Sequence, residues 1–245
     1  MFDLDRCAVV GMVHLLPLPG SPGWGGHLEP VIQRALSDAR ALSDGGVDAL
    51  IVENMGDVPY ERGRIDPAGL AAAAVVARQV VGVGLPTGIQ LLAGANLEAL
   101  AAAVAAGASF IRAEAFAYAH VADEGLLEAS AAVLLRQRRS LGAAVQVWAD
   151  VQKKHAAHAL TADLSLSDLA LGSAFCGADA LVVTGKHTGE PPPRPRTCAR
   201  PDGRDPGRRG LVGDPDDAGA LAKEADALIV AATSSTTATG ARRST

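Results

Sequence analysis

Aromatic residues are scarce in this sequence, which has two Trp, two Tyr and four Phe among 245 residues. Because 49% of the residues are nevertheless hydrophobic, a full core must be built chiefly from Ala, Val and Leu. The sequence also has no apolar run close to the roughly 18 residues that read as a membrane span, and no charged-then-apolar leader. We therefore expect no membrane span, no signal peptide and a cytoplasmic protein.

Cysteine and positive charge are also in short supply. The cysteines Cys7, Cys176 and Cys198 are odd in number and have no metal-binding spacing, which is typical of reduced thiols inside a cell. The formal net charge of −5 argues against a nucleic-acid-binding surface. No P-loop, Rossmann glycine motif or serine elbow is present, so the commonest nucleotide-binding and hydrolase classes are excluded.

What the sequence does contain is a recurring short apolar run that follows a helical stretch and ends in polar residues. This pattern is typical of a buried parallel strand, and it occurs at Gly46–Glu53, Gly107–Glu114, Gly177–Thr184 and Glu224–Val230. Four further apolar runs bring the total to eight: Cys7–Leu15, Thr87–Ala93, Ala143–Val151 and Gly210–Asp214. Eight strands alternating with helices over this length predict a single-domain (β/α)8 TIM barrel spanning residues 1–245. A doubly wound open sheet has the same alternation but fits eight units and this length less well.

Helix boundary signals support the alternation. A helix from Leu28 has Pro30 in its first turn and ends at Gly45-Gly46, and a second begins at Pro67 after the capping residue Asp66. Two more helices are expected, one capped by Asn96 and running from Leu97 to Ala106, the other capped by Asp123 and ending at Leu141-Gly142.

The pattern fails in two places near the C-terminal end of the sequence. Twelve of the nineteen residues from Pro191 to Arg209 are Pro or Arg, so no sixth helix is expected there, and the seventh strand shrinks to Leu211–Gly213. Residues 231–245 form a polar tail rich in Ala, Ser and Thr. Residues 190–210 form an irregular segment rich in Pro and Arg, and we interpret the stretch from about Pro193 to Val212 and residues 231–245 as local reading-frame disruptions in a GC-rich gene. The alternative is a genuine exposed linker and a disordered tail.

Polar residues gather at the carboxyl ends of the predicted strands, where the active site of a barrel enzyme lies. Each could have a purely structural role: His14 as a hydrogen-bonded strand-end residue, and Arg112 as a partner of Glu114. His155 and His158 share a helical spacing, but a metal site there is disfavoured because the segment resembles a solvated loop. The candidate residues, in strand order, are His14; Glu53 and Asn54; Gln90; Arg112 and Glu114; Asp150, Lys154 and His155; and Thr184, Gly185, Lys186, Thr188 and Gly189.

Several motifs together resemble the BtpA/SgcQ family, whose namesake is a photosystem I biogenesis protein. The resemblance covers about residues 7 to 190 and rests on Met12–Leu15 with Pro17–Pro22, Asp44–Asp48 with Val52–Asn54 and Asp57–Tyr60, Phe110–Arg112, His120–Gly125, Ala149–Val151 with Lys154-His155, and Val183–Gly185 with Thr188–Glu190. It implies a barrel of the ribulose-phosphate-binding type. It implies little about the chemistry, because the activity of the family is poorly defined.

The resulting functional prediction is an enzyme that acts on a small phosphorylated sugar or nucleoside-like metabolite. We expect His14 or Asp150 to act as acid or base with Glu53 as partner, and Arg112 to hold an anionic group. Schiff-base chemistry at Lys186 is a sharper variant, and lyase, aldolase and hydrolase reactions all stay open.

Two other classes of function stay open. One is a divalent-metal enzyme using Glu53, Asp150 and His14, although no cofactor is predicted. The other is a non-catalytic assembly factor, as the name of the family suggests. An Ala-rich barrel exterior also leaves a homo-oligomer open.

Overall fold

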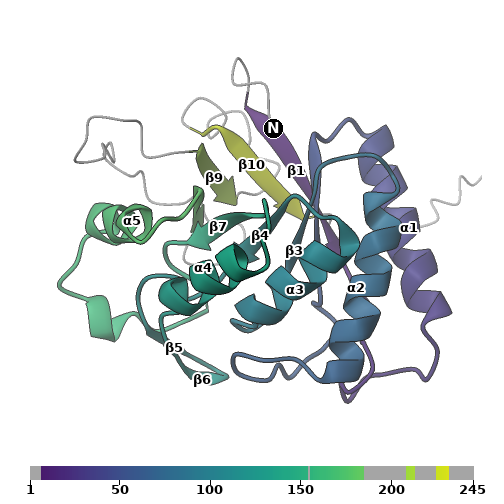
Figure 1. The fold of residues 1–245 in the computed structure, drawn as a ribbon, viewed down its shortest axis with the longest axis horizontal. Helices are drawn as coiled ribbons and strands as arrows, with labels where there is room; N and C mark the ends of the chain where they lie inside the picture. The colour runs from purple at the N-terminus through teal and green to yellow at the C-terminus, as the bar shows by residue number, and fades with distance from the viewer. Residues whose placement is uncertain (1–6, 154, 185–207, 213–224, 232–245) are drawn as a thin grey trace, which may run out of the picture.

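The computed structural model describes residues 7–153, 155–184, 208–212 and 225–231, which form a closed barrel of eight parallel strands (Figure 1). Around the barrel the strands follow the order β1, β10, β9, β8, β7, β4, β3 and β2. Strand β1 pairs with both β2 and β10, so the sheet has no free edge. This closure confirms the predicted TIM-barrel class over the open-sheet alternative.

All eight predicted strands form, several of them shorter than the apolar runs that predicted them. Their bounds are β1 Ala8–His14, β2 Ala49–Glu53, β3 Thr87–Gln90, β4 Phe110–Ala113, β7 Gln146–Asp150, β8 Ala180–Thr184, β9 Arg208–Val212 and β10 Ala227–Ala231. The helices lie outside the strands in Figure 1: α1 Glu29–Asp44, α2 Pro67–Val81, α3 Asn96–Ala106, α4 Ala131–Ser140 and α5 Leu166–Phe175, with a 3-10 turn at Ala159–Thr161.

The first two helices begin and end where the sequence predicts. The α1 helix has Pro30 in its first turn and is followed by Gly45. Asp66 caps α2 by accepting a hydrogen bond from the Ala68 amide at 2.8 Å. Such a cap contributes about 1 kcal/mol by satisfying an amide that has no partner in the first turn.

The other two predicted caps are wrong. Asn96 is the first residue of α3, and its buried side-chain amide donates instead to the Glu114 carbonyl at 2.7 Å and to Ser130 Oγ at 2.9 Å. The helix expected from Asp123 begins only at Ala131, because residues 120–127 form a β-hairpin of β5 (His120–Ala122) and β6 (Gly125–Leu127). This hairpin lies at the end of the barrel toward which the strands run (Figure 1).

The interior of the barrel is a separate apolar cluster that contains only strand residues and no helix side chain. It consists of alternate strand residues, namely Ala8, Val10, Met12, Ala49, Ile51, Phe110, Trp148, Ala180, Val182, Ala227 and Ile229. The intervening residues, such as Val13, Val52 and Ile111, pack outward in a second cluster with α1 to α4. The Phe110 and Trp148 rings stack at 3.9 Å between centroids, and the Phe110 ring lies against Gly88, which has no side chain to obstruct it. Two of the scarce aromatic side chains therefore fill the inside of the barrel.

The region of the predicted disruption closes the barrel. Strand β9 begins at Arg208, three residues before the expected Leu211, and pairs with both β8 and β10. The rest of segment 190–210, the tail after Ala231, Cys198 and the candidates Lys154, Gly185, Lys186, Thr188 and Gly189 lie outside the described residues. Among the residues that are described, no helix has the length and apolarity to cross a membrane.

Candidate active site

The alternation of the strands places the predicted polar residues in one layer inside the barrel. Side chains two residues apart on a strand point the same way, so each residue two positions after Met12, Ile51 or Trp148 also points into the barrel. On six of the strands this next inward position is polar: His14, Glu53, Gln90, Arg112, Asp150 and Thr184. Strand register sets His14 beside Glu53, and Glu53 beside Gln90. This layer covers the apolar interior at the carboxyl end of the barrel, which we call the mouth.

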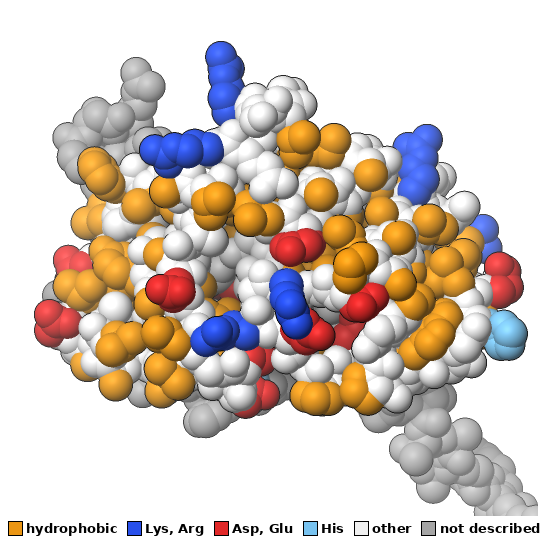
Figure 2. Space-filling model, turned by 60° about the horizontal axis from the view of Figure 1, so that its bottom comes forward, with side chains coloured by type: hydrophobic (Ala, Val, Ile, Leu, Met, Phe, Trp, Pro, Cys, Tyr) orange, Lys and Arg blue, Asp and Glu red, His pale blue; other side chains and the backbone are white. Residues whose placement is uncertain are grey.

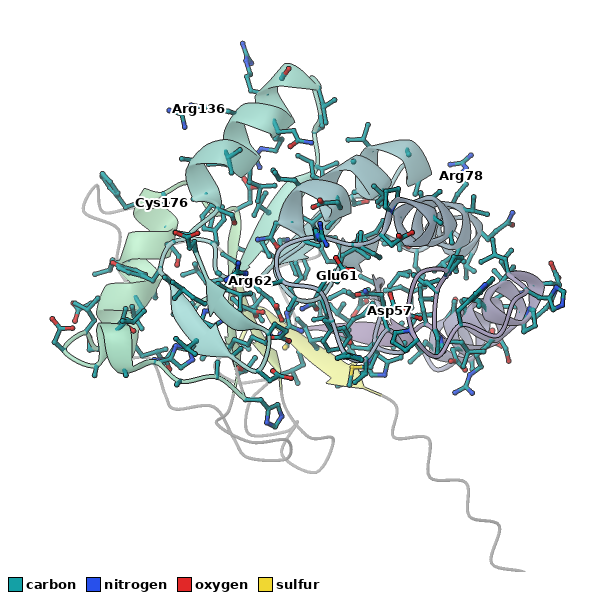
Figure 3. All side chains as sticks on the ribbon, turned by 90° about the horizontal axis from the view of Figure 1, so that it is seen from below. Asp57, Glu61, Arg62, Arg78, Arg136 and Cys176 are labelled. Carbon is teal, nitrogen blue, oxygen red and sulfur yellow. The ribbon has the colours of Figure 1, made fainter. Side chains whose placement is uncertain are left out.

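Charged side chains gather near the centre of the molecule on the face shown in Figure 2, and the mouth is seen from below in Figure 3. In that view Glu61 and Arg62, from the segment between β2 and α2, lie close to the centre. Both are exposed, whereas the polar layer beneath is buried. A polar, buried strand-end layer overhung by loops is the usual form of a barrel active site.

At the rim of the mouth, His14 and Glu53 form a pair. His14 Nε2 lies 3.2 Å from Glu53 Oε2, and the two side chains are 33% and 9% exposed. The carboxylate can orient the imidazole, while the exposed part of the ring can reach a ligand. The predicted partnership of these two residues is therefore geometrically available.

Deeper in the barrel, Arg112 and Asp150 form a buried ion pair. Asp150 Oδ1 accepts from both Arg112 Nε at 3.1 Å and Arg112 Nη2 at 3.0 Å. Burial raises the pKa of Asp150, although the Arg112 charge opposes this. Burial alone would lower the Arg112 pKa, but the charges of Asp150, Glu53 and Glu114 and the hydrogen bond to Asp150 together outweigh burial, so the pKa is raised. Arg112 therefore pairs with Asp150, not with Glu114 as the structural alternative supposed.

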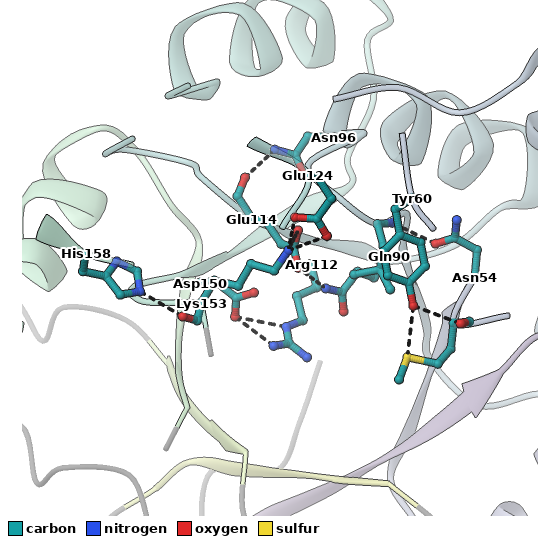
Figure 4. A network of polar contacts seen from close by, with 12 residues as sticks. Asn54, Tyr60, Gln90, Asn96, Arg112, Glu114, Glu124, Asp150, Lys153 and His158 are labelled. Atoms are coloured by element: carbon teal, nitrogen blue, oxygen red, sulfur yellow. Dashed lines mark hydrogen bonds and ion pairs between the residues drawn. The ribbon is translucent and has the colours of Figure 1, made fainter. Parts of the chain in front are cut away.

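A second buried charge cluster joins three parts of the chain that are distant in sequence (Figure 4). Lys153, which follows β7, places its Nζ 3.2 Å from both carboxylate oxygens of Glu124 in the β5–β6 turn. The same Nζ lies 3.5 Å from Glu114 Oε2, just after β4. Burial lowers the pKa of Lys153, but the carboxylates of Glu114 and Glu124 more than offset this and raise it overall. Lys153 is therefore a permanent cation that is already shared between two acids.

Glu114 has the proton affinity expected of an acid–base group. Burial raises its pKa to about 7, the Lys153 charge opposes that rise, and the neighbouring Asp150 carboxylate reinforces it. Its Oε1 lies 3.5 Å from Gln90 Nε2, which places the amide against the carboxyl group. A carboxyl group that exchanges its proton near neutral pH, inside a barrel mouth, is well placed to act as acid or base.

Asn54 and Asp57 connect the loops around the mouth. The Leu92 amide donates to Asn54 Oδ1 at 2.8 Å, and Asn54 Nδ2 donates to Asp57 Oδ2 at 2.9 Å. Asp57 Oδ1 in turn accepts from the Leu18 amide at 2.7 Å. The loops after β1, β2 and β3 are thus held together by two buried side chains. Asn54, predicted as a ligand-binding residue, has a bracing contact on each of its two polar atoms.

Three further side chains near the mouth were not among the candidate residues, although His158 was considered as a metal ligand and His120 and Tyr60 lie in motifs that resemble the family. His120 is 4% exposed, its ring centroid lies 5.4 Å from that of His158, and burial, followed by the charges of His158 and Lys153, lowers its pKa to about 4. His158 Nε2 lies 2.8 Å from the Lys153 carbonyl. Tyr60 donates to the Met55 carbonyl at 2.9 Å, and burial, then Glu53 and Asp57, raises its pKa to about 12.

The structure thus brings together most of the predicted residues that it describes. Thr184 ends β8 and donates to the Gln152 carbonyl at 3.0 Å, whereas His155 is exposed and takes no part in these contacts. Lys153 and Glu124 were the main omissions. A turn signal at Asp123–Gly125 could have indicated the hairpin that carries Glu124. Within the described ranges, no group of three His, Cys, Asp or Glu side chains is arranged as metal ligands.

Comparisons with known proteins connect this chain to one family. The model of the BtpA family matches residues 5–197. An uncharacterised mitochondrial protein of Caenorhabditis elegans is 40% identical over 196 residues, covering 77% of this chain and 71% of its own length. The photosystem I biogenesis protein BtpA of Synechocystis is 42% identical over 188 residues, covering 75% of this chain and 64% of its own.

Solved structures share the fold at low sequence identity. A candidate phosphonomutase from Burkholderia cenocepacia superimposes with a TM-score of 0.56 at 17% identity, covering 93% of this chain and 88% of the other. The N-acetylmannosamine-6-phosphate 2-epimerase of Clostridium perfringens gives a TM-score of 0.50 at 11% identity, covering 94% and 88%. At such identities the likeness extends to the barrel fold alone.

Proposed function

The chain belongs to the BtpA family, and from this premise we propose that it is an enzyme that performs acid–base chemistry on a small phosphorylated sugar or nucleoside-like metabolite. The observation that carries the proposal is the position of Glu114. It is buried in the barrel mouth between Lys153 and Gln90, where its proton is exchangeable near neutral pH. A buried carboxyl group that must ionise near neutral pH lowers the stability of the folded protein. Its presence in the mouth is most readily explained by a role in proton transfer.

In the proposed reaction Glu114 gives or takes a proton at a carbon or oxygen of the substrate. Lys153 would moderate the negative charge that Glu114 acquires when it is ionised, since the two groups lie 3.5 Å apart. The His14–Glu53 pair at the rim provides a second proton carrier. Asp150 would act chiefly by holding Arg112 in place, because the two form a buried ion pair. This differs from our first expectation, in which Arg112 held the anionic group itself.

The phosphorylated nature of the substrate rests on two supports. The epimerase that shares the fold acts, by its name, on a 6-phosphorylated sugar. In barrels of this kind a phosphate is commonly bound by the loops after strands seven and eight. In the present chain Thr184, Gly185, Thr188 and Gly189, which end or follow the sixth barrel strand in the sequence, remain our predicted substrate-binding residues, and Lys186 remains the candidate for Schiff-base chemistry.

The test is proton exchange on a substrate panel. The purified full-length protein would be incubated in D2O with phosphorylated aldoses, ketoses, N-acetylamino sugars and nucleosides, and solvent deuterium incorporation would be followed by NMR. We expect exchange or turnover with at least one compound, and a loss of about 100-fold or more in Glu114→Gln, which retains the shape but cannot transfer the proton. The exposed Glu128→Gln is the matched control.

Two results would contradict the proposal: no exchange and no turnover across the panel, or undiminished exchange in Glu114→Gln. Parallel reactions with EDTA and with added Mg²⁺ or Mn²⁺ would test the divalent-metal alternative. Activity that is lost with EDTA and regained with one ion would assign the chemistry to a metal enzyme.

A non-catalytic assembly role is the second candidate, favoured by the name of the 42% identical Synechocystis relative. It predicts that the mouth can be inactivated without loss of biological function. A His14→Ala, Glu114→Gln double variant that restored photosystem I accumulation in Synechocystis lacking BtpA as well as the unmodified chain does would support assembly. If the unmodified chain restored photosystem I and the double variant did not, the result would support a catalytic role.

A further inference from the structure

Three buried oxygen atoms in the mouth accept no hydrogen bond from the part of the chain that the structure describes. They are Gln90 Oε1, Glu114 Oε2 and Asp150 Oδ2. Their residues are only 1%, 3% and 6% exposed, so bulk water does not satisfy them in the way it satisfies surface groups. A buried acceptor without a donor costs about 1 to 3 kcal/mol, and three at one place are unusual.

These acceptors belong to one small site. Gln90 Nε2 lies 3.5 Å from Glu114 Oε1, so the two side chains touch. Strands β4 and β7 are paired up to Ala113 and Ala149, which puts the next residues, Glu114 and Asp150, side by side. Figure 4 shows Gln90, Glu114 and Asp150 close together in one polar network with Arg112 and Lys153. The three oxygens therefore belong to neighbouring side chains of one polar network.

The alternative orientation of the Gln90 amide does not remove the problem. Exchanging its oxygen and nitrogen would set the amide oxygen against Glu114 Oε1, which is also an acceptor when Glu114 is ionised. Likewise, Glu114 Oε2 has an ion-pair contact with Lys153 at 3.5 Å, but this distance is beyond a normal charge-assisted hydrogen bond. Asp150 uses Oδ1 for both contacts with Arg112, which leaves Oδ2 without a partner.

The charges of the site also define what it can accept. Its two buried cations, Arg112 and Lys153, are each held by carboxylates, and Glu53 adds a further acid at the rim. A phosphate placed against Glu114 and Asp150 would meet acceptor atoms and negative charge. A group that donates hydrogen bonds, and carries no negative charge, would satisfy them.

We infer that Gln90, Glu114 and Asp150 form the subsite for the hydroxyl-bearing part of a polyhydroxylated substrate, with its phosphate directed away from these three side chains. The inference rests on the proposed function for its substrate class, and it assigns that substrate's hydroxyl groups to named acceptors. An alcohol is both small and a donor, and adjacent hydroxyls of a sugar can reach acceptors on neighbouring strands.

The test compares ligands that differ in hydroxyl groups but share a phosphate. D-ribose 5-phosphate, 2-deoxy-D-ribose 5-phosphate and propyl phosphate would be titrated into the full-length protein by calorimetry. We expect D-ribose 5-phosphate to bind at least tenfold more tightly than propyl phosphate, because each missing hydroxyl leaves a buried acceptor unpaired. Equal affinities, or no measurable binding of either compound, would overturn the inference.

A variant pair then locates the effect. Gln90→Met removes the acceptor while keeping an unbranched side chain, and we expect it to lose about tenfold in affinity for D-ribose 5-phosphate and none for propyl phosphate. Gln79→Met makes the same change at an exposed position of α2 and should alter neither affinity. A uniform loss for both ligands in Gln90→Met would show a general structural defect instead.

A crystal structure of the protein soaked with D-ribose 5-phosphate provides a check that does not depend on these variants folding. Sugar hydroxyls on the three oxygens would support the inference. Protein donors on those oxygens, including any from residues 185–189, would refute it. Binding requires no turnover, so the two hypotheses can fail separately. Binding that depends on the hydroxyl groups, without proton exchange, would reject the proposed function and keep the subsite. Proton exchange with binding that does not depend on the hydroxyl groups would reject the subsite and keep the proposed function.

Discussion

The sharpest stability prediction concerns Glu114→Gln. Folding raises the pKa of Glu114 from 4.5 to about 7, chiefly through burial. The folded protein therefore binds this proton more tightly than the unfolded chain does, and stability falls as the pH rises from about 4.5 to about 7. At about 1.4 kcal/mol for each pH unit in that window, the ionised carboxylate costs about 3 kcal/mol at pH 8.

Gln replaces the protonated acid with a neutral group of the same shape, so the cost should disappear. Lys153 would keep its contacts with both oxygens of Glu124, and the substitution leaves no unpaired buried cation. We expect the variant to match the parent protein near pH 4, below the unfolded pKa, and to exceed its unfolding free energy by about 3 kcal/mol at pH 8. For a domain of this size such a gain corresponds to about 6 to 12 °C in Tm.

Urea unfolding followed by tryptophan fluorescence, measured between about pH 4 and pH 8, would test this. Trp148 is buried inside the barrel and should report its loss. The exposed Glu128→Gln serves as control and should show no pH-dependent gap. A gap between Glu114→Gln and the parent that stays constant over the whole pH range would refute the reasoning, because only a titrating group can make it grow.

Three further outcomes follow from the buried groups. Gly88→Ala should destabilise the protein by about 1 to 3 kcal/mol in chemical unfolding, because the new methyl would lie 2.2 Å from the Phe110 ring, and Phe110→Leu should recover part of the loss. Arg112→Met should cost about 3 to 5 kcal/mol by leaving Asp150 buried without its cation, a loss that Tm measurements would detect and an unchanged Tm would contradict. Because folding lowers the His120 pKa to about 4, stability should fall as the pH drops from 6.5 toward 4, and His120→Gln should flatten that slope in acid titrations.

The barrel was predictable because its signals are local and repeated. Each strand run, such as Gly46–Glu53 or Gly177–Thr184, carries its own apolar pattern and ends in polar residues. Strand alternation then fixes which residues face inward, so the clustering of His14, Glu53 and Asp150 at one end follows from the same pattern. Asp66 was a correct cap because Ala68 lies only two residues away.

The errors arose where a distant partner competes with a local preference. Asn96 has the residue type of a helix cap, but the Glu114 carbonyl and Ser130 offer its amide buried hydrogen bonds that no local signal reveals. Asp123 likewise looks like a cap, whereas residues 120–127 pair as a hairpin. The contacts of Asn96 join residues 18 or more positions apart in the sequence. The hairpin that contains Asp123 is an insertion into the repeated strand–helix unit.

That insertion also determines the chemistry of the mouth. Glu124 lies in the hairpin turn and holds Lys153, and Lys153 in turn sets how strongly burial can raise the pKa of Glu114. Without Glu124, the ammonium would be free to move closer to Glu114 and would draw its pKa down. The repeated strand pattern therefore predicts where the mouth lies, while the proton affinity inside it depends on a hairpin that the repeat does not contain.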